Sequence, residues 1–404
     1  MNIETIIVEF FPTIGCCSVS GKELSKIQEL DPVKEMAICH QTRAGVLATI
    51  PAHCHILDFR RSMLYTLMSV GLTALLMGAA HAFLPVPTCS PLSMVLWAAY
   101  ATMTGTVAFG IWVIGHECGH NAFCTTAWVG HVVGYICHSI LLVPYFSWRR
   151  SHQVHHAHTN HITDGETHVP HTYGTVFGSL LHAVHHLAGD VILGLAQLFV
   201  YLVLGWPAYL LFGATGSPQR DYGLSNHFLA WGPQLFPRRA WLLYCLSTLG
   251  VVVMLGVLYA CANAYGTHVV IGLYAGPLMV SNAWLVMITW LQHTDVHVPH
   301  MDSSVWTWAM GASQTIDRPY HWILDLLHHR IGTTHQMHHF VPTIPHYHAV
   351  EATAALRAAF PAVHRFDPTP ILTALWRVAS TCVVCYKQGD GTYRFTPPMS
   401  RSTH

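Results

Sequence analysis

Three histidine clusters stand at the ends of long apolar runs, and this arrangement restricts the fold more than any other feature of the chain. The clusters are His116-Glu-Cys-Gly-His120, His152-Gln-Val-His155-His156 and His335-Gln-Met-His338-His339. Histidines three or four positions apart lie on one side of a helix, and neutral imidazole is a common metal ligand. We therefore expect the three clusters to meet at one metal centre, on one side of a membrane that the apolar runs cross.

The composition is typical of a polytopic membrane protein. Hydrophobic residues make up 52% of the 404 residues and charged residues only 9%, whereas about a quarter of the residues of a soluble protein are charged. The formal net charge is zero, so no nucleic acid or strongly acidic partner is expected. Several of the 12 cysteines lie inside apolar runs, which favours buried thiols in a reducing, cytosol-facing environment over a disulfide framework.

Two apolar runs, 62–84 and 93–115, predict the first membrane hairpin. Each is long enough for a helix that crosses about 30 Å of hydrocarbon at about 1.5 Å per residue. The link between them carries no charge, whereas Arg60 and Arg61 precede the first run. The positive-inside rule then places the open end of the hairpin, and with it the first histidine cluster, in the cytosol.

The remaining apolar runs predict a second hairpin and two helices that do not cross the membrane. Run 127–146 has histidine clusters on both flanks, so it must return to the side from which it started. The second and third clusters need an even number of crossings between them. Runs 241–262 and 269–291 form the second hairpin, because the link between them holds no Lys or Arg. Run 188–213, interrupted by the sequence Gly-Trp-Pro, should return to the cytosolic face.

The expected fold is therefore an all-α polytopic membrane protein. It has four transmembrane helices in two hairpins, two helices embedded on the cytosolic side, and a cytosolic cap from about residue 292 onward that holds the metal centre. We divide the chain into an N-terminal cytosolic arm (1–50), a membrane domain that carries the histidine clusters (51–360) and a C-terminal cytosolic tail (361–404).

The number and type of ligands predict two metal ions. The clusters supply eight imidazoles, and His293, at the cytosolic end of the last span, is expected to be a ninth ligand. In each His-x-x-His-His cluster, the residues at i and i+3 share a helix face and the adjacent histidine points about 100° away, so one turn can present ligands to two ions or two ligands to one ion. Imidazole suits iron, zinc, copper or nickel better than magnesium or calcium, and one tetrahedral zinc takes only four ligands.

Carboxylates near the clusters have two possible roles. Each could accept a hydrogen bond from a ring N–H group and so fix the orientation of a ligand, or it could face solvent. The candidates are Glu117, Asp164, Glu166, Asp295, Asp302 and Glu351.

A two-metal centre at a membrane surface favours the oxidation of a lipid. A dinuclear iron site that binds O₂ can remove hydrogen from an unactivated methylene; loss of two hydrogens gives a double bond, and return of oxygen gives a hydroxyl group. Both outcomes need external electrons, and the sequence has no Rossmann-type GxGxxG segment and no recognisable haem-binding segment, so a separate donor is expected. A divalent-metal transporter is the remote alternative, since transporters place ionisable residues inside their spans.

The clusters resemble the histidine boxes of the membrane fatty acid desaturases, and their surroundings resemble the microsomal delta-12 and omega-3 group. Further similar stretches are Thr49-Ile-Pro-Ala-His-Cys54, Leu291-Gln-His-Thr294 and Ile344-Pro-His-Tyr-His-Ala-Val-Glu-Ala-Thr353, and the resemblance covers roughly residues 45–360. It implies that two irons, at a catalytic centre, are bound by His116, His120, His152, His155, His156, His293, His335, His338 and His339.

The same resemblance implies an enzyme of the endoplasmic reticulum membrane with its boxes facing the cytosol. It would use O₂, and electrons from NADH passed through a reductase and cytochrome b5, to convert oleate on phosphatidylcholine to linoleate. An omega-3 desaturase, or a related fatty acid hydroxylase or conjugase, is the alternative. Asn121 stands where the family usually has another histidine, and Thr333 where it usually has an aspartate, which leaves the regiochemistry open.

Overall fold

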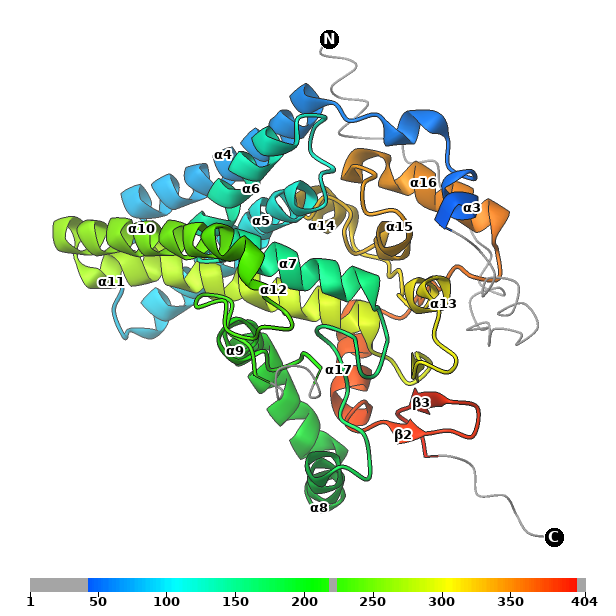
Figure 1. Cartoon of the computed structure of the whole chain (residues 1–404). Helices are drawn as coiled ribbons and strands as arrows, with labels where there is room; N and C mark the ends of the chain where they lie inside the picture. Colours follow the sequence, from blue (N-terminus) through cyan, green and yellow to red (C-terminus); the bar gives the residue numbers. More distant parts are fainter. Residues whose placement is uncertain (1–42, 218–223, 398–404) are drawn as a thin grey trace.

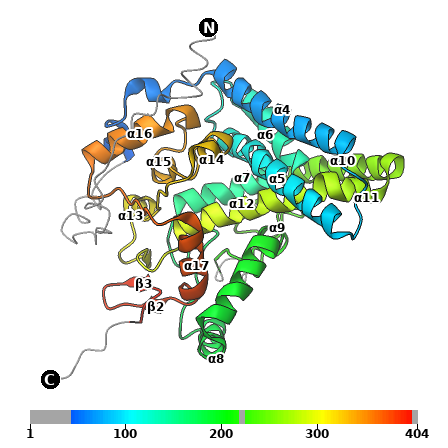
Figure 2. The same ribbon diagram turned by 180° about the vertical axis from the view of Figure 1, so that it is seen from behind.

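The structure is a computed structural model that describes residues 43–217 and 224–397, and this part of the chain is mostly helical. Long helices run side by side toward one end of the molecule, and shorter helices form a cap at the other (Figure 1, Figure 2). The long helices are α4 (Phe59–Phe83), α5 (Pro91–Gly119), α10 (Trp241–Tyr265) and a continuous helix made of α11 (Thr267–Val270), the π-helical η5 (Ile271–Ala275) and α12 (Gly276–His293).

The starts of α4 and α5 are set by local side chains. The Asp58 carboxylate accepts hydrogen bonds from the first backbone N–H groups of α4, and the Ser90 hydroxyl accepts one at the start of α5. Pro91 occupies the first turn of α5, where its missing N–H costs nothing. Gly105 lets α12 approach α5 closely, because a Cβ there would lie 2.5 Å from the Pro277 carbonyl oxygen.

Five helices of the described residues are long and apolar enough to cross a membrane. Four of them correspond to the two predicted hairpins, and their outward faces expose large apolar side chains such as Leu75 (66%) and Leu242 (66%), as lipid-facing helices do. The fifth, Val176–Phe212, includes the run predicted to stay at one face. The four-span arrangement therefore stays a prediction.

This fifth helix is continuous where a break was expected. It consists of α8 (Val176–Phe199), the π-helical η2 (Val200–Gly205) and α9 (Trp206–Phe212). The interruption predicted at the Gly-Trp-Pro sequence is wrong, because the wider π-helical turn before Trp206 accommodates a proline that lacks an N–H. The break lies instead at Gly189, which has a φ of 73°. In Figure 1, α8 runs obliquely to α10 and α12.

The run 127–146 does not continue straight into the second histidine cluster. It forms α6 (Ala127–Ile140) and the start of α7 (Tyr145–Ala157), and these two helices meet at 104°. The bend brings α7 back beside the end of α5, where the rings of His116 and His152 are 4.8 Å apart.

The cap is built from short helices and a small sheet. Its helices are α3 (Arg43–Leu47), η1 (Ala52–His55), α13 (Trp308–Ser313), α14 (Trp322–Leu327), α15 (His335–Phe340), α16 (His346–Ala359) and α17 (Ile371–Thr381); a further 3-10 turn, η4 (Arg238–Ala240), precedes α10. The all-α expectation needs correcting here, because β1 (His300–Met301), β3 (Thr392–Arg394) and β2 (Tyr386–Lys387) form an antiparallel sheet in that order.

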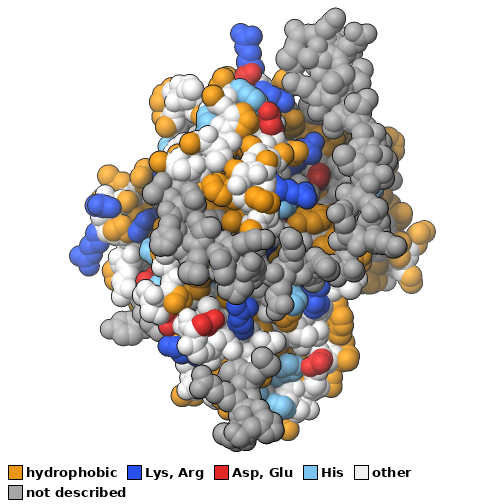
Figure 3. Space-filling view, turned by 90° about the vertical axis from the view of Figure 1, so that its right-hand side faces the viewer, with side chains coloured by type: hydrophobic (Ala, Val, Ile, Leu, Met, Phe, Trp, Pro, Cys, Tyr) orange, Lys and Arg blue, Asp and Glu red, His pale blue; other side chains and the backbone are white. Residues whose placement is uncertain are grey.

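Both ends of the described chain pack into the cap. Val46 of α3 is fully buried in a cluster with Met337 and Phe340 of α15. Helix α17 packs against the oblique helix at Gly194, where Trp376 approaches to 3.2 Å of a Cβ position. Figure 3 faces the cap and shows Lys, Arg, Asp and Glu side chains across it, whereas α10, α11 and α12 contain none of these residues. Charge therefore gathers at the end that holds the histidine clusters.

Candidate metal centre

The structure brings all nine predicted ligands together where four helices converge. His116 lies in the last turn of α5 and His120 caps it, the second cluster lies on α7, His293 is the last residue of α12, and the third cluster lies on α15. The four helices lie far apart in the sequence, so the centre forms only when the chain has folded.

Five of the histidines form a first group. Their potential ligand atoms all lie within 4.8 Å of one another, and the Nε2 atom of His156 is 3.2 Å from that of His152 and 3.1 Å from that of His338. The members of this first group are His116, His120, His152, His156 and His338.

The other four histidines form a second group beside it. His155, His293 and His339 have ligand atoms within 4.8 Å of one another. The Nε2 atom of His335 is 3.0 Å from the Nε2 atoms of both His293 and His339. The two groups adjoin, because the rings of His156 and His339 stack at 4.2 Å.

Each His-x-x-His-His cluster is shared between the two groups. His152 and His156 belong to the first group and His155 to the second, whereas His335 and His339 belong to the second and His338 to the first. Each cluster therefore presents side chains to both groups, which is one of the two arrangements that its spacing allows. Residues at i and i+4 point about 40° apart around a helix and those at i and i+3 about 60° apart, so the i, i+4 pair converges better on one point.

The residues present fit two transition-metal ions. Several Nε2 atoms face one another at hydrogen-bond distance, yet a neutral imidazole has only one N–H to donate. The buried Nε2 atom of His120 has no hydrogen-bond partner among the described residues. Burial, reinforced by neighbouring imidazoles, holds the pKa of His338 and of His339 well below its usual value, so both rings are neutral at pH 7. Neutral nitrogen donors suit iron, zinc or copper.

Two of the rings are oriented by groups that are not carboxylates. The Nδ1–H of His155 donates to the carbonyl oxygen of Glu166 at 2.8 Å. The Nδ1–H of His339 donates to the hydroxyl of Thr159 at 3.0 Å, and that hydroxyl donates to the carbonyl oxygen of His155. Both rings thereby turn Nε2 toward the centre. Thr159 was not predicted, and only its place four residues after His155 could have indicated it.

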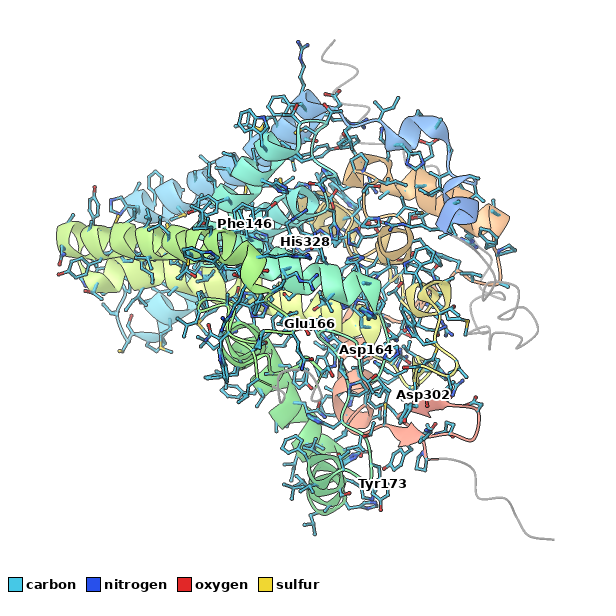
Figure 4. The ribbon with its side chains drawn as sticks, in the orientation of Figure 1. Phe146, Asp164, Glu166, Tyr173, Asp302 and His328 are labelled. Carbon is cyan, nitrogen blue, oxygen red and sulfur yellow. The ribbon has the colours of Figure 1, made fainter. Side chains whose placement is uncertain are left out.

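The six carboxylates considered from the sequence contact different groups in the structure. Buried Glu117 lies 3.5 Å from the Nδ1 atom of His116 and accepts the backbone N–H of His346. The Glu166 carboxylate accepts a hydrogen bond from the Tyr209 hydroxyl, whereas the backbone carbonyl of Glu166 orients His155. The others contact groups outside the centre. Asp164 lies near His161 and Asp302 pairs with Lys387; both carboxylates are labelled in Figure 4. Asp295 pairs with Arg318 and Arg377, and Glu351 pairs with His53.

An apolar cavity adjoins both groups of histidines. The empty space in the cavity and at its open mouth amounts to about 820 Å³. Five histidines of the two groups contribute to its wall, and most of the other lining residues are apolar or aromatic, including Trp112, Trp148, Trp206, Tyr209, Leu285, Val286 and Ile288. Such a space fits a long apolar ligand with one reactive segment beside the metals.

The two departures from the family pattern lie outside this arrangement. Asn121 is exposed and has a φ of 58°, a left-handed conformation that asparagine tolerates. The Thr333 hydroxyl donates to the Asp325 carboxylate at 3.1 Å.

We expect Asn121→His to leave the bound metal nearly unchanged, because the backbone at this position directs the side chain to solvent. Metal per chain, measured by mass spectrometry on the purified protein, tests this expectation. A loss of half of the metal or more would show that Asn121 supports the centre.

Comparisons with known proteins agree with the geometry. Residues 93–369 match the family model "Fatty acid desaturase". The chain is 40% identical to an oleoyl-12-hydroxylase of Ricinus communis over 85% of this chain and 86% of the relative. It is 38% identical to a delta(12)-fatty-acid desaturase of Arabidopsis thaliana over 91% of this chain and 94% of the relative. It is 39% identical to an endoplasmic reticulum omega-6 fatty acid desaturase of Brassica juncea over 83% of this chain and 85% of the relative. These relatives are lipid-modifying enzymes rather than metal transporters.

Proposed function

The chain belongs to the fatty acid desaturase family of oxidoreductases, and from this we propose that it is a delta-12 acyl-lipid desaturase that converts oleate to linoleate. The observation that carries the proposal is the convergence of nine imidazoles, in two groups, beside an apolar cavity that five of them help to line. A cavity of this kind holds an acyl chain, and the histidines hold the metals that oxidise it.

We assign one iron ion to each group of histidines. The first would be held by His116, His120, His152, His156 and His338, and the second by His155, His293, His335 and His339. When bound, two irons supply O₂-dependent removal of hydrogen from a methylene, with electrons from NADH that arrive through a reductase and cytochrome b5. The hydrogen bonds from His155 and His339 to Glu166 and Thr159 keep the ligands oriented before substrate arrives.

The walls of the cavity position the acyl chain. Trp112, Trp206 and Leu285 exclude water from the reacting carbons and leave the chain few conformations. A second cavity shares His168, Tyr201 and Thr215 with the first and is lined by residues of α8 and by Cys382 and Val383, which follow α17. We propose that this second cavity admits the acyl chain of phosphatidylcholine from the membrane.

The charge distribution supports an endoplasmic reticulum enzyme with four spans and its histidines facing the cytosol. Arg60 and Arg61 open α4, and Arg238 and Arg239 immediately precede α10. Positive charge at these helix starts, and none in the link between α10 and α11, favours a cytosolic cap. The oblique course of α8 and its packing on α17 favour a helix that stays at the membrane surface.

Expression in a yeast that makes only monounsaturated lipids tests the proposed reaction. With cytochrome b5 supplied, gas chromatography of the lipids should show linoleate. Hydroxylated or triene products would instead support the hydroxylase or omega-3 alternative, and the hydroxylase is a serious candidate because the Ricinus relative is as similar as the desaturases. Unchanged fatty acids despite good protein accumulation would refute the proposal.

A bulky side chain in the cavity should block the reaction without removing metal. Val286 of α12 lies on the cavity wall within 3.6 Å of a Cβ position at Gly205 of η2. We expect Val286→Trp to reduce linoleate about tenfold or more, because the indole fills the space and overpacked interiors do not readily expand. Val253→Trp is the matched control, since Val253 is 58% exposed on the outer face of α10. Equal product from both variants would place the acyl chain elsewhere.

A further inference from the structure

A second set of metal-binding side chains lies outside the nine-histidine centre. His53 and Cys54 lie on η1, shortly before α4, and His348 and Glu351 lie one turn apart on α16. One potential ligand atom from each of the four lies within 4.8 Å of all the others. We propose that these residues bind a structural zinc ion that ties η1 to α16.

The ligand types suit zinc. A thiolate, two imidazoles and a carboxylate make a four-coordinate set of the kind that closed zinc sites use, whereas the nine-histidine centre offers nitrogen alone. The thiolate and the carboxylate together balance the charge of a divalent cation. The present site is thus chemically distinct from the proposed iron centre and does not depend on the proposed function.

The distances are close to those that zinc needs. The Nε2 atom of His53 is 2.8 Å from Oε1 of Glu351 and 3.8 Å from Sγ of Cys54. Ligand atoms around a tetrahedral zinc lie about 3.3–3.8 Å apart, given metal–ligand bonds of about 2.0–2.3 Å. The His53–Glu351 contact must lengthen by about half an ångström, and both side chains are 52% exposed and therefore free to adjust.

Burial favours the neutral thiol of Cys54 over its thiolate unless a cation is present. Cys54 is fully buried, and burial together with the Glu351 carboxylate raises the pKa of its thiol to about 11. Zinc binding would displace the thiol proton. Since His53 and Glu351 are half-exposed, solvent reaches the outer side of the cluster, and Cys54 closes the inner side.

The site would stabilise the contact between α16 and the first long helices. The residues that precede His348 already connect to them: the backbone N–H of His346 donates to the Glu117 carboxylate beside His116, and the Tyr347 hydroxyl accepts the backbone N–H of Asp58. A zinc ion one turn along α16 would hold these contacts in place. Its role is therefore to position, and it touches no reacting atom.

Metal analysis of the full-length protein tests the inference. The protein is purified in detergent without a metal-affinity tag, and zinc and iron are measured by mass spectrometry. We expect about one zinc per chain in addition to iron. Cys54→Ser and His348→Ala should each lower zinc about fivefold or more while iron stays unchanged. His55→Ala is the matched control, because His55 is exposed on the same turn but lies outside the cluster.

A milder variant and a spectroscopic signal cover the case in which Cys54→Ser does not fold. Glu351→Gln changes a half-exposed side chain and should lower the affinity for zinc about tenfold in a competition with a chromophoric chelator. Cobalt in place of zinc should give a thiolate-to-metal charge-transfer absorption, which histidines cannot produce. Absence of zinc from the iron-loaded wild type, zinc unchanged in both His348→Ala and Glu351→Gln, or cobalt binding without that absorption would each overturn the proposal.

Discussion

Replacing His155 with Ala should abolish the fatty acid product. The ring lies in the second group, with its Nε2 atom 3.2 Å from that of His293, and it is held there by the Glu166 carbonyl oxygen. Of the histidines nearby, His168 belongs to neither group, and its ring centroid lies 5.6 Å from that of His293. We expect product to fall by about a hundredfold or more and iron to fall from about two ions per chain toward one.

His297→Ala is the control for this experiment. His297 lies four residues after His293, but its side chain is exposed and it belongs to neither group. Linoleate and iron should both stay near the wild-type level in this variant. If His155→Ala kept a tenth of the product with its iron intact, our assignment of His155 as a ligand would be wrong.

The sequence predicted that the eight clustered histidines meet, because the spacing within each cluster is a local property of a helix. His152 and His156, or His335 and His339, share a helix face wherever the helix lies. The division into two groups depends instead on how α7 and α15 approach each other, and no spacing along one helix contains that information. Thr159 could not be predicted for the same reason, because it lies 180 residues before His339, the ring that it orients.

The apolar runs predicted the long helices for a similar reason, whereas their ends and irregularities needed tertiary context. Pro207 was expected to break its helix, but the π-helical η2 absorbs it, and the break occurs at Gly189 with a positive φ. The strand pairing of β1 with β3 joins residue 300 to residue 393 and has only a few residues on each side. Strands this short leave no alternating pattern long enough to read.

The polar connection between the end of α12 and the C-terminal part of the cap was also not predicted. Arg318 is fully buried, and its guanidinium pairs with the carboxylates of Asp295 and Asp367. Arg377 pairs with the same two carboxylates, each at 2.6 Å. From sequence, Asp295 was considered either as a support for a metal ligand or as a solvent-facing residue, because pairing partners from other segments cannot be recognised by spacing. Its actual role is to join α12 to α17.

Replacing Arg318 with Met should therefore destabilise the cap strongly. The guanidinium also donates through Nε to the carbonyl oxygen of Leu291 at 3.0 Å, so it fixes the last turn of α12, which ends at His293. Methionine fills much of the volume but leaves two buried carboxylates with Arg377 as their shared cation. Breaking a buried network from one side costs about 3–5 kcal/mol, so we expect a lower melting temperature, less folded protein and less iron.

Two comparisons separate this network from a general effect of removing an arginine. Arg357→Met changes an exposed residue of α16 and should leave the melting temperature unchanged. Arg318→Lys keeps the charge but not the three directions of hydrogen bonding, so its loss of stability should be intermediate.

The pH dependence of this stabilisation follows from Asp367. Burial raises the pKa of its carboxyl group, but the Thr369 hydrogen bond and the Arg318 charge outweigh burial and hold the pKa at about 2. A depressed carboxylate pKa stabilises the fold above the unfolded value of about 4 and loses that effect as the pH falls toward 2. The difference in melting temperature between wild type and Arg318→Met should thus be constant from about pH 6 to pH 8 and shrink only in acid, and a wild-type melting temperature for Arg318→Met would contradict the role of this network.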